Sequence, residues 1–119
     1  MKGNGEKLVA VIDPIWVGHH PMYFAQFAAA FLRQGARVIA ACPDPDDARR
    51  ELVELVGGEE VSGKVIFRRL ETAQRSFFNG RFEGDPLRTA MRWKQAADAI
   101  DEGEDEAGKA ADLVYFPYL

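Results

Sequence analysis

Four short apolar runs, each separated from the next by a stretch long enough for a helix, constrain the fold of this chain most strongly. Residues 8–12, Leu-Val-Ala-Val-Ile, are continuously apolar and rich in β-branched side chains, which is typical of a strand buried on both faces. The other runs occupy residues 37–42, 64–68 and 113–116. No two-residue hairpin turn joins any of them. The sequence therefore predicts an α/β fold with a parallel sheet.

Proline and glycine mark the ends of the intervening helices. Pro21, Pro45 and Pro86 suit the first helical position, where a missing N–H costs nothing, and the preceding Asp44 and Asp85 are typical N-caps. We expect the first helix to end at Gly35 and the second at Gly57-Gly58. The first helix is expected to bury one apolar face, which consists of Phe24, Phe27, Ala28, Phe31 and Leu32. Leu55 is expected on the buried face of the second helix.

Right-handed crossovers would place the first strand inside the sheet, with the second and third strands to one side. If the fourth strand lies on the other side, the order is 3-2-1-4. This is a Rossmann-like three-layer αβα arrangement, and we expect residues 1–119 to form it as a single domain. Ligands of such sheets bind at the carboxyl ends of the strands, where the strand order reverses. The loop from Asp13 to His20 and the segment Pro117-Tyr118 both reach that crevice.

Charge and cysteine content exclude several functions. The 15 Lys and Arg residues against 19 Asp and Glu give a net charge of -4, with no basic stripe for a phosphate backbone, so nucleic acid is not an expected partner. The single cysteine, Cys42, closes no intrachain disulfide and is expected to be a buried, inert thiol. The apolar runs are too short to cross a bilayer, and the N-terminus carries no signal segment. We expect a cytoplasmic protein that can touch a membrane surface.

The loop after the first strand holds the candidate binding residues, which are Asp13, Trp16, Gly18, His19 and His20. Both histidines precede a helix, whose N–H groups and dipole attract phosphate or carboxylate. A histidine there can donate a hydrogen bond to a sugar hydroxyl or act as a general base. Gly18 permits close backbone approach or a positive φ.

Each of these residues also has a simpler interpretation. Trp16 either stacks on a sugar or base or packs on the domain, and Asp13 either meets a ligand hydroxyl or only opens a turn. His19 could be a plain surface residue and His20 a weak cap, and both are expected on an exposed loop. We expect no metal site. The two adjacent histidines have no third ligand, and the run of acids at residues 101–106 is expected at the end of a helix or in its exit loop.

Other motifs are absent or ambiguous. The chain has no Gly-x-Gly-x-x-Gly, no P-loop and no Gly-x-Ser-x-Gly. Arginines are locally in excess between residues 68 and 92, namely Arg68, Arg69, Arg75, Arg81, Arg88 and Arg92. They either form a solvated face or bind an anionic ligand or lipid headgroup.

Two stretches resemble the N-terminal domain of GT-B glycosyltransferases of the retaining type, which includes glycogen-synthase-like, mannosyl- and glucosyltransferases. The first runs from Val9 through Gly18-His19-His20 to Cys42-Pro43, and the second from Ala111 to Phe116. The resemblance implies a domain that binds the acceptor, which is a sugar or lipid-linked molecule. It also implies that Gly18, His19 and His20 contact the acceptor or a phosphate group. It also implies catalysis with no bound metal or other cofactor.

The chain departs from that family because it has no donor domain and no Glu-x7-Glu signature. We expect a partial N-terminal domain, either a fragment or a subunit of a split transferase, inactive until a C-terminal domain or a partner chain supplies the nucleotide-sugar site. The alternative is a small stand-alone flavodoxin-like ligand-binding module. A phospho-receiver is disfavoured because Arg68-Arg69 ends the third strand where the phosphorylated Asp would stand.

Overall fold

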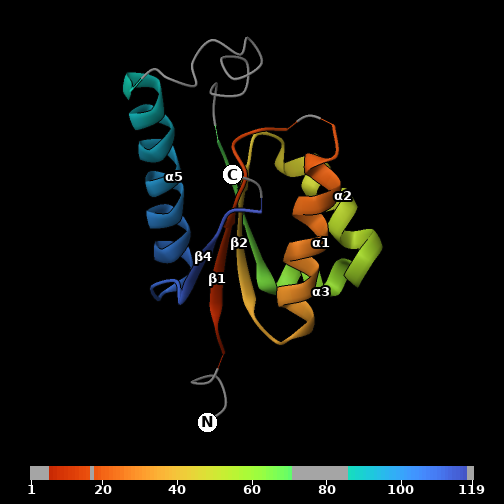
Figure 1. Cartoon of the computed structure of the whole chain (residues 1–119). Coiled ribbons are helices and arrows are strands. Elements are labelled where there is room, and N and C mark those ends of the chain that lie inside the picture. Colours follow the sequence, from red (N-terminus) through yellow and green to blue (C-terminus); the bar gives the residue numbers. More distant parts are fainter. Residues whose placement is uncertain (1–5, 17, 71–85, 118–119) are drawn as a thin grey trace.

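The computed structural model of the chain describes residues 6–16, 18–70 and 86–117, with the backbone alone for residues 86–93. One parallel sheet runs through it in the order β3-β2-β1-β4, which confirms the predicted order (Figure 1). Its strands are β1 (Leu8–Ile12), β2 (Arg37–Cys42), β3 (Val65–Arg69) and β4 (Leu113–Tyr115). Asp85, Arg75, Arg81 and Tyr118, which the sequence singled out, lie outside the described residues.

The two central strands are the most thoroughly buried. Every residue of β1 is buried, as are all but the first of β2, because these strands have neighbours on both edges and helices over both faces. Val9 is in register with Val38 of β2 and with Leu113 of β4. The third strand begins one residue later than expected, because Lys64 is the last residue of the preceding helix.

Helices cover the sheet on two sides, which completes the three layers (Figure 1). Helices α1 (His20–Arg33), α2 (Pro45–Val56) and α3 (Gly58–Lys64) lie on one side, and α5 (Pro86–Ala107) lies on the other. Successive side chains of β1 point to opposite faces, so Val9 and Val11 join the core under α1 and Leu8, Ala10 and Ile12 join the core under α5. None of the described helices is both long and apolar enough to span a membrane.

Most helix ends follow the sequence signals, but α1 begins at His20 with His19 as its N-cap, so Pro21 is its second residue and not its first, as expected. Asp44 caps α2 by accepting a hydrogen bond from the Asp47 N–H at 3.1 Å, and Gly35 ends α1 with φ of 92°. Gly57, with φ of 96°, ends α2 but also begins α3, a helix that we did not expect. The buried face of α1 includes Ala25 and Ala29 rather than Phe27, which is 36% exposed.

Helix α5 approaches the sheet most closely through a glycine. A Cβ atom at Gly103 would lie 2.6 Å from Cγ2 of Ile39 on β2, a distance at which something must shift. The acidic run at residues 101–106 belongs to α5 itself rather than to its exit loop. Within it, the carboxylate of Glu104 accepts a hydrogen bond from the Ala111 N–H at 2.7 Å, which ties the end of α5 to the segment before β4.

Candidate functional site

Asp13 stands at the carboxyl end of the central strand β1. Its backbone N–H donates to the Ala41 carbonyl at 3.0 Å, which extends the β1–β2 pairing one residue past the strand. The side chain is only 1% exposed, and among the described residues it is the buried charged group. A carboxylate in this position requires hydrogen-bond partners, because desolvation of an unpaired charge is costly.

Two donors meet the Asp13 carboxylate. The Ile15 N–H donates to Oδ1 at 3.0 Å, which forms a local turn, and Nδ1 of His20 lies 2.9 Å from Oδ2. Burial raises the pKa of the Asp13 carboxyl above its ordinary value, and the hydrogen bonds from His20 and Ile15 partly oppose that rise. When Asp13 is ionised, it accepts the Nδ1 proton and thereby fixes the tautomer and orientation of the His20 ring.

The structure separates the two histidines. The expectation that both lie on an exposed loop is wrong for His20, which is the first residue of α1 and has a side chain that is 12% exposed. Its placement follows from the bond to Asp13, a partner seven residues away that the sequence pattern did not reveal. His19 is exposed and serves as the N-cap residue of α1 without a side-chain capping bond, and its ring is 6.1 Å from that of Tyr23.

Gly18 supplies the conformation of the turn that precedes α1. Its φ is 58°, in the left-handed region that favours glycine, and it is exposed. A Cβ at this position would meet no atom within 4 Å, so space does not require the glycine. Gly18 and His19 are therefore the candidate residues that solvent, and hence a ligand, reaches most directly.

Trp16 packs on the domain. The residue is 8% exposed, its ring lies edge-on to that of Phe24 with centroids 5.2 Å apart, and Nε1 donates to Oδ2 of Asp47 at 2.9 Å. Of the two interpretations of Trp16, the structure shows the packed one. Asp47, on the first turn of α2, thus fixes Trp16 and with it the candidate loop. Sequence reasoning missed this role because the two residues are 31 positions apart.

Three further side chains lie at this edge of the sheet. Cys42 is buried as expected, and burial raises the pKa of its thiol to about 12. Arg69 donates from Nη1 to the Pro43 carbonyl at 3.0 Å. Arg68 lies 3.8 Å from Glu102 and 3.5 Å from Glu106 on α5, so its charge faces the acidic run of that helix. Over the described residues, no group of three potential ligands is close enough to hold a metal ion.

The reversal of strand order between β1 and β4 lies beside this loop. Tyr115, at the end of β4, contacts Phe27 and Phe31 of α1 with ring centroids 5.1 and 5.6 Å apart, so α1 packs over the edge strand as well as over β1. Pro117, the described part of the Pro117-Tyr118 segment, is half-buried. The ring contacts hold the edge strand β4 against the second half of α1.

Fold and site define a class, a Rossmann-like α/β domain whose central strand ends in a buried aspartate bonded to the first helical histidine. In comparisons with known proteins, no family model, no curated protein and no solved structure matches the chain.

Proposed function

We propose that this chain is the acceptor-binding part of a GT-B glycosyltransferase, an enzyme that transfers a sugar from a nucleotide-diphosphate sugar to an acceptor. The observation that carries the proposal is the 2.9 Å contact between His20 and the buried Asp13 at the carboxyl end of β1, beside the point where strand order reverses. The resemblance of residues 9–43 to the opening of such enzymes supports the choice of a sugar transferase.

The candidate residues divide into two roles. Asp13, His20 and Trp16 hold the loop through hydrogen bonds to Ile15, to each other and to Asp47. Gly18 and His19 are exposed at the start of α1, where they can meet a hydroxyl or phosphate group of the acceptor. Because Asp13 fixes the His20 ring, the turn that presents Gly18 and His19 is organised before the acceptor arrives.

The nucleotide-sugar donor is assigned to a further domain or a partner chain. No phosphate-binding glycine motif follows β1, so this chain offers the donor diphosphate no site of the usual Rossmann type. The proposed reaction needs no metal, as the resemblance implies. The acceptor is a sugar or lipid-linked molecule, and in the lipid-linked case the chain works at a membrane surface.

A titration followed by the amide NMR spectrum of the isotope-labelled chain tests the proposal. Glucose 6-phosphate, used as an acceptor-like probe, should shift the amides of Gly18 and His19, and His19→Ala should weaken this binding about tenfold, the loss of one hydrogen bond to a charged group. Gln26→Ala, an exposed change on α1, is the matched control.

A second titration uses UDP-glucose alone. It should leave the same amides unshifted, because the donor is assigned to another domain. Micromolar binding of UDP-glucose to this chain would contradict the proposal and would identify a stand-alone nucleotide-binding module instead.

A further inference from the structure

A polar groove lies between the end of β3 and α5, on the side of the sheet away from α1. Its volume is about 280 Å³, and its lining consists of Arg69, Leu70, Gln95, Asp98, Ala99 and Glu102. The groove opens at the carboxyl edge of the sheet, because Leu70 directly follows β3 and its N–H donates to the Cys42 carbonyl at 2.9 Å. It is separate from the Asp13–His20 pair and shares no lining residue with it.

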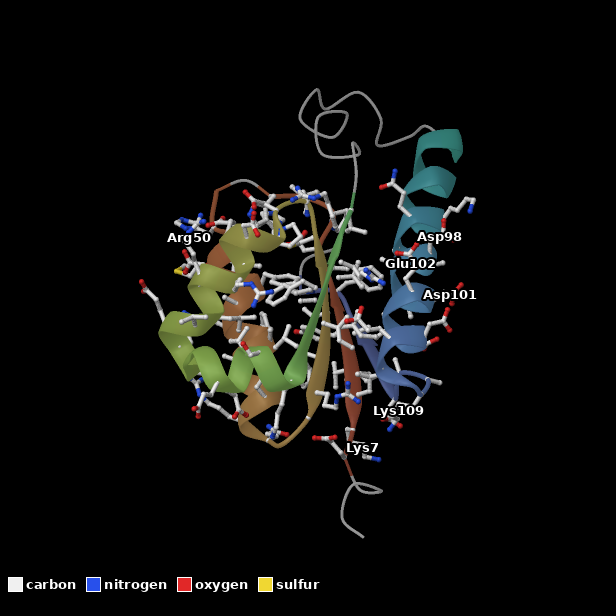
Figure 2. All side chains as sticks on the ribbon, turned by 180° about the vertical axis from the view of Figure 1, so that it is seen from behind. Lys7, Arg50, Asp98, Asp101, Glu102 and Lys109 are labelled. Atoms are coloured by element: carbon white, nitrogen blue, oxygen red, sulfur yellow. The ribbon has the colours of Figure 1, made fainter. Side chains whose placement is uncertain are left out.

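The groove follows from the sequence of α5. Gln95, Asp98, Ala99 and Glu102 recur at helical spacing and so share one face of α5, and Asp98 and Glu102 lie on successive turns (Figure 2). The face of α5 directed at the sheet is apolar, because Ala96 and Ala99 are buried in one core cluster with Leu70 and Ile39. Gln95, Asp98 and Glu102 lie beside this stripe, and Gly103, one residue beyond Glu102, brings α5 against β2. The polar groove thus borders the buried contact of α5 with the sheet.

One wall of the groove is cationic. Arg69 is exposed, and its Nη1 is held by the Pro43 carbonyl at 3.0 Å. A guanidinium carries five N–H donors, so this bond fixes the group and leaves it further donors for a ligand. Within the part of the chain that the structure describes, no carboxylate lies within ion-pair distance of Arg69.

The other wall is anionic, and its carboxylates keep acceptor capacity. Asp98 accepts from Nζ of Lys94 at 3.0 Å, a contact at the surface. Glu102 lies 3.8 Å from Nε of Arg68, too far for a hydrogen bond, and among the described residues that buried Nε has no hydrogen-bond partner. Each carboxylate has two oxygens, so both can accept from ligand hydroxyls. The apolar contribution comes from Leu70 and Ala99, which are 5% and 4% exposed.

We propose that this groove binds one neutral sugar ring. Ring hydroxyls can donate to Asp98 and Glu102 and accept from Arg69, above the nearly buried Leu70 and Ala99. Charges of both signs meet at the groove, because Lys94 stands beside Asp98 and Arg68 beside Glu102, so a neutral ligand suits it better than an ion. Ligand pockets hold about 300–1,000 Å³, so a groove of about 280 Å³ suits a single ring. The inference deepens the proposed function and rests on it, because it locates the sugar part of the acceptor.

Methyl α-glucoside and methyl α-mannoside, titrated into the isotope-labelled chain, test the groove. We expect millimolar binding that shifts the amides of Leu70, Ala99 and Glu102, and a loss of about tenfold in affinity in Glu102→Gln. The matched control is Asp101→Asn, because Asp101 is an exposed acid of the same helix, on the side away from the sheet (Figure 2). Thermal melting establishes that each variant is folded, and Asp98→Asn replaces Glu102→Gln if the latter fails to fold.

The outcomes separate the groove from the proposed function. Three outcomes would each overturn the groove proposal. The amides could fail to shift at millimolar glycoside, or Glu102→Gln and Asp101→Asn could weaken binding equally. The groove could also bind glucose 6-phosphate more strongly than the glycoside. Glucose 6-phosphate shifts at Gly18 and His19, without glycoside shifts at Leu70 and Ala99, would support the proposed function while removing the groove. Glycoside shifts at Leu70 and Ala99 that persist in His19→Ala support the groove whatever the result at His19.

Discussion

Nδ1 of His20 lies 2.9 Å from Oδ2 of Asp13, so the first residue of α1 is bonded to the carboxylate that immediately follows β1. This contact closes the loop between the central strand and the first helix. It also gives the two adjacent histidines different surroundings, since His19 remains exposed. The stability of the domain should therefore distinguish them.

His20→Ala should lower the free energy of unfolding by about 1–3 kcal/mol, because it leaves the buried Asp13 carboxylate with the Ile15 N–H and without its ring partner. His19→Ala should change it by less than about 0.5 kcal/mol, as is usual for an exposed side chain. Urea unfolding followed by circular dichroism measures both. Equal midpoints for the two variants would show that the Asp13 contact contributes nothing to stability.

Asp13→Asn should change how stability depends on pH. Burial raises the pKa of the Asp13 carboxyl above 3.8, so the folded chain binds this proton more tightly than the unfolded chain does. Its contribution to stability is complete below pH 3.8 and is lost as the pH rises through the folded pKa. The free energy of unfolding of the parent relative to Asp13→Asn should therefore fall as the pH rises above 3.8 in a urea series. A difference that grows with pH would contradict the direction of the shift.

Gly103→Ala should destabilise the fold by about 1–3 kcal/mol through overpacking against Ile39, despite a gain in helix propensity of up to about 1 kcal/mol. The second substitution Ile39→Val removes a methyl group at the clash and should restore part of the loss. Gly63→Ala is the matched control, because Gly63 lies in α3 and a Cβ there meets nothing within 4 Å. Thermal melting of the three variants checks the ranking, which an unchanged Gly103→Ala would overturn.

The thiol of Cys42 should be unreactive in the native state. Burial raises its pKa to about 12, so almost no thiolate exists at neutral pH, and the side chain is inaccessible. Ellman's reagent should react at once in denaturing urea and only slowly in buffer. A chain carrying Gln26→Cys, which adds an exposed thiol on α1, supplies the reactive control. Rapid native labelling of the parent would show that β2 opens readily.

The strands could be predicted because each has a core of consecutive apolar residues, and a run such as Leu8–Ile12 admits few alternatives. The expected strand order was correct, although the handedness of the crossovers indicated only the positions of the first three strands, and the side of β4 was an added condition. Helix α3 was missed because Gly57-Gly58 indicates a stop, and only the structure shows the chain restarting a helix at Gly58. Likewise, Phe27 and Leu55 have the helical spacing of core residues, yet they are 36% and 38% exposed.

The sequence indicated where the candidate residues lie in the fold, but it did not indicate which contacts they make. Because the loop contains Asp13 and both histidines, its composition indicated a candidate binding site at the carboxyl end of β1. The pairing of Asp13 with His20 and of Trp16 with Asp47 depends on the path of the turn at Gly18 and on how α2 packs beside α1. Such contacts come from tertiary packing, which local sequence patterns do not encode.

The position of β1 between β2 and β4 bears on how the chain folds. The Leu8 N–H donates to the carboxylate of Asp112, 104 residues away, so one edge of the central strand stays unpaired during translation until residues near 112 have emerged from the ribosome. Pairings of this sequence separation are slow to form. We expect the exposed edge of β1 to be the point at which a nascent chain is most open to capture by chaperones or to aggregation.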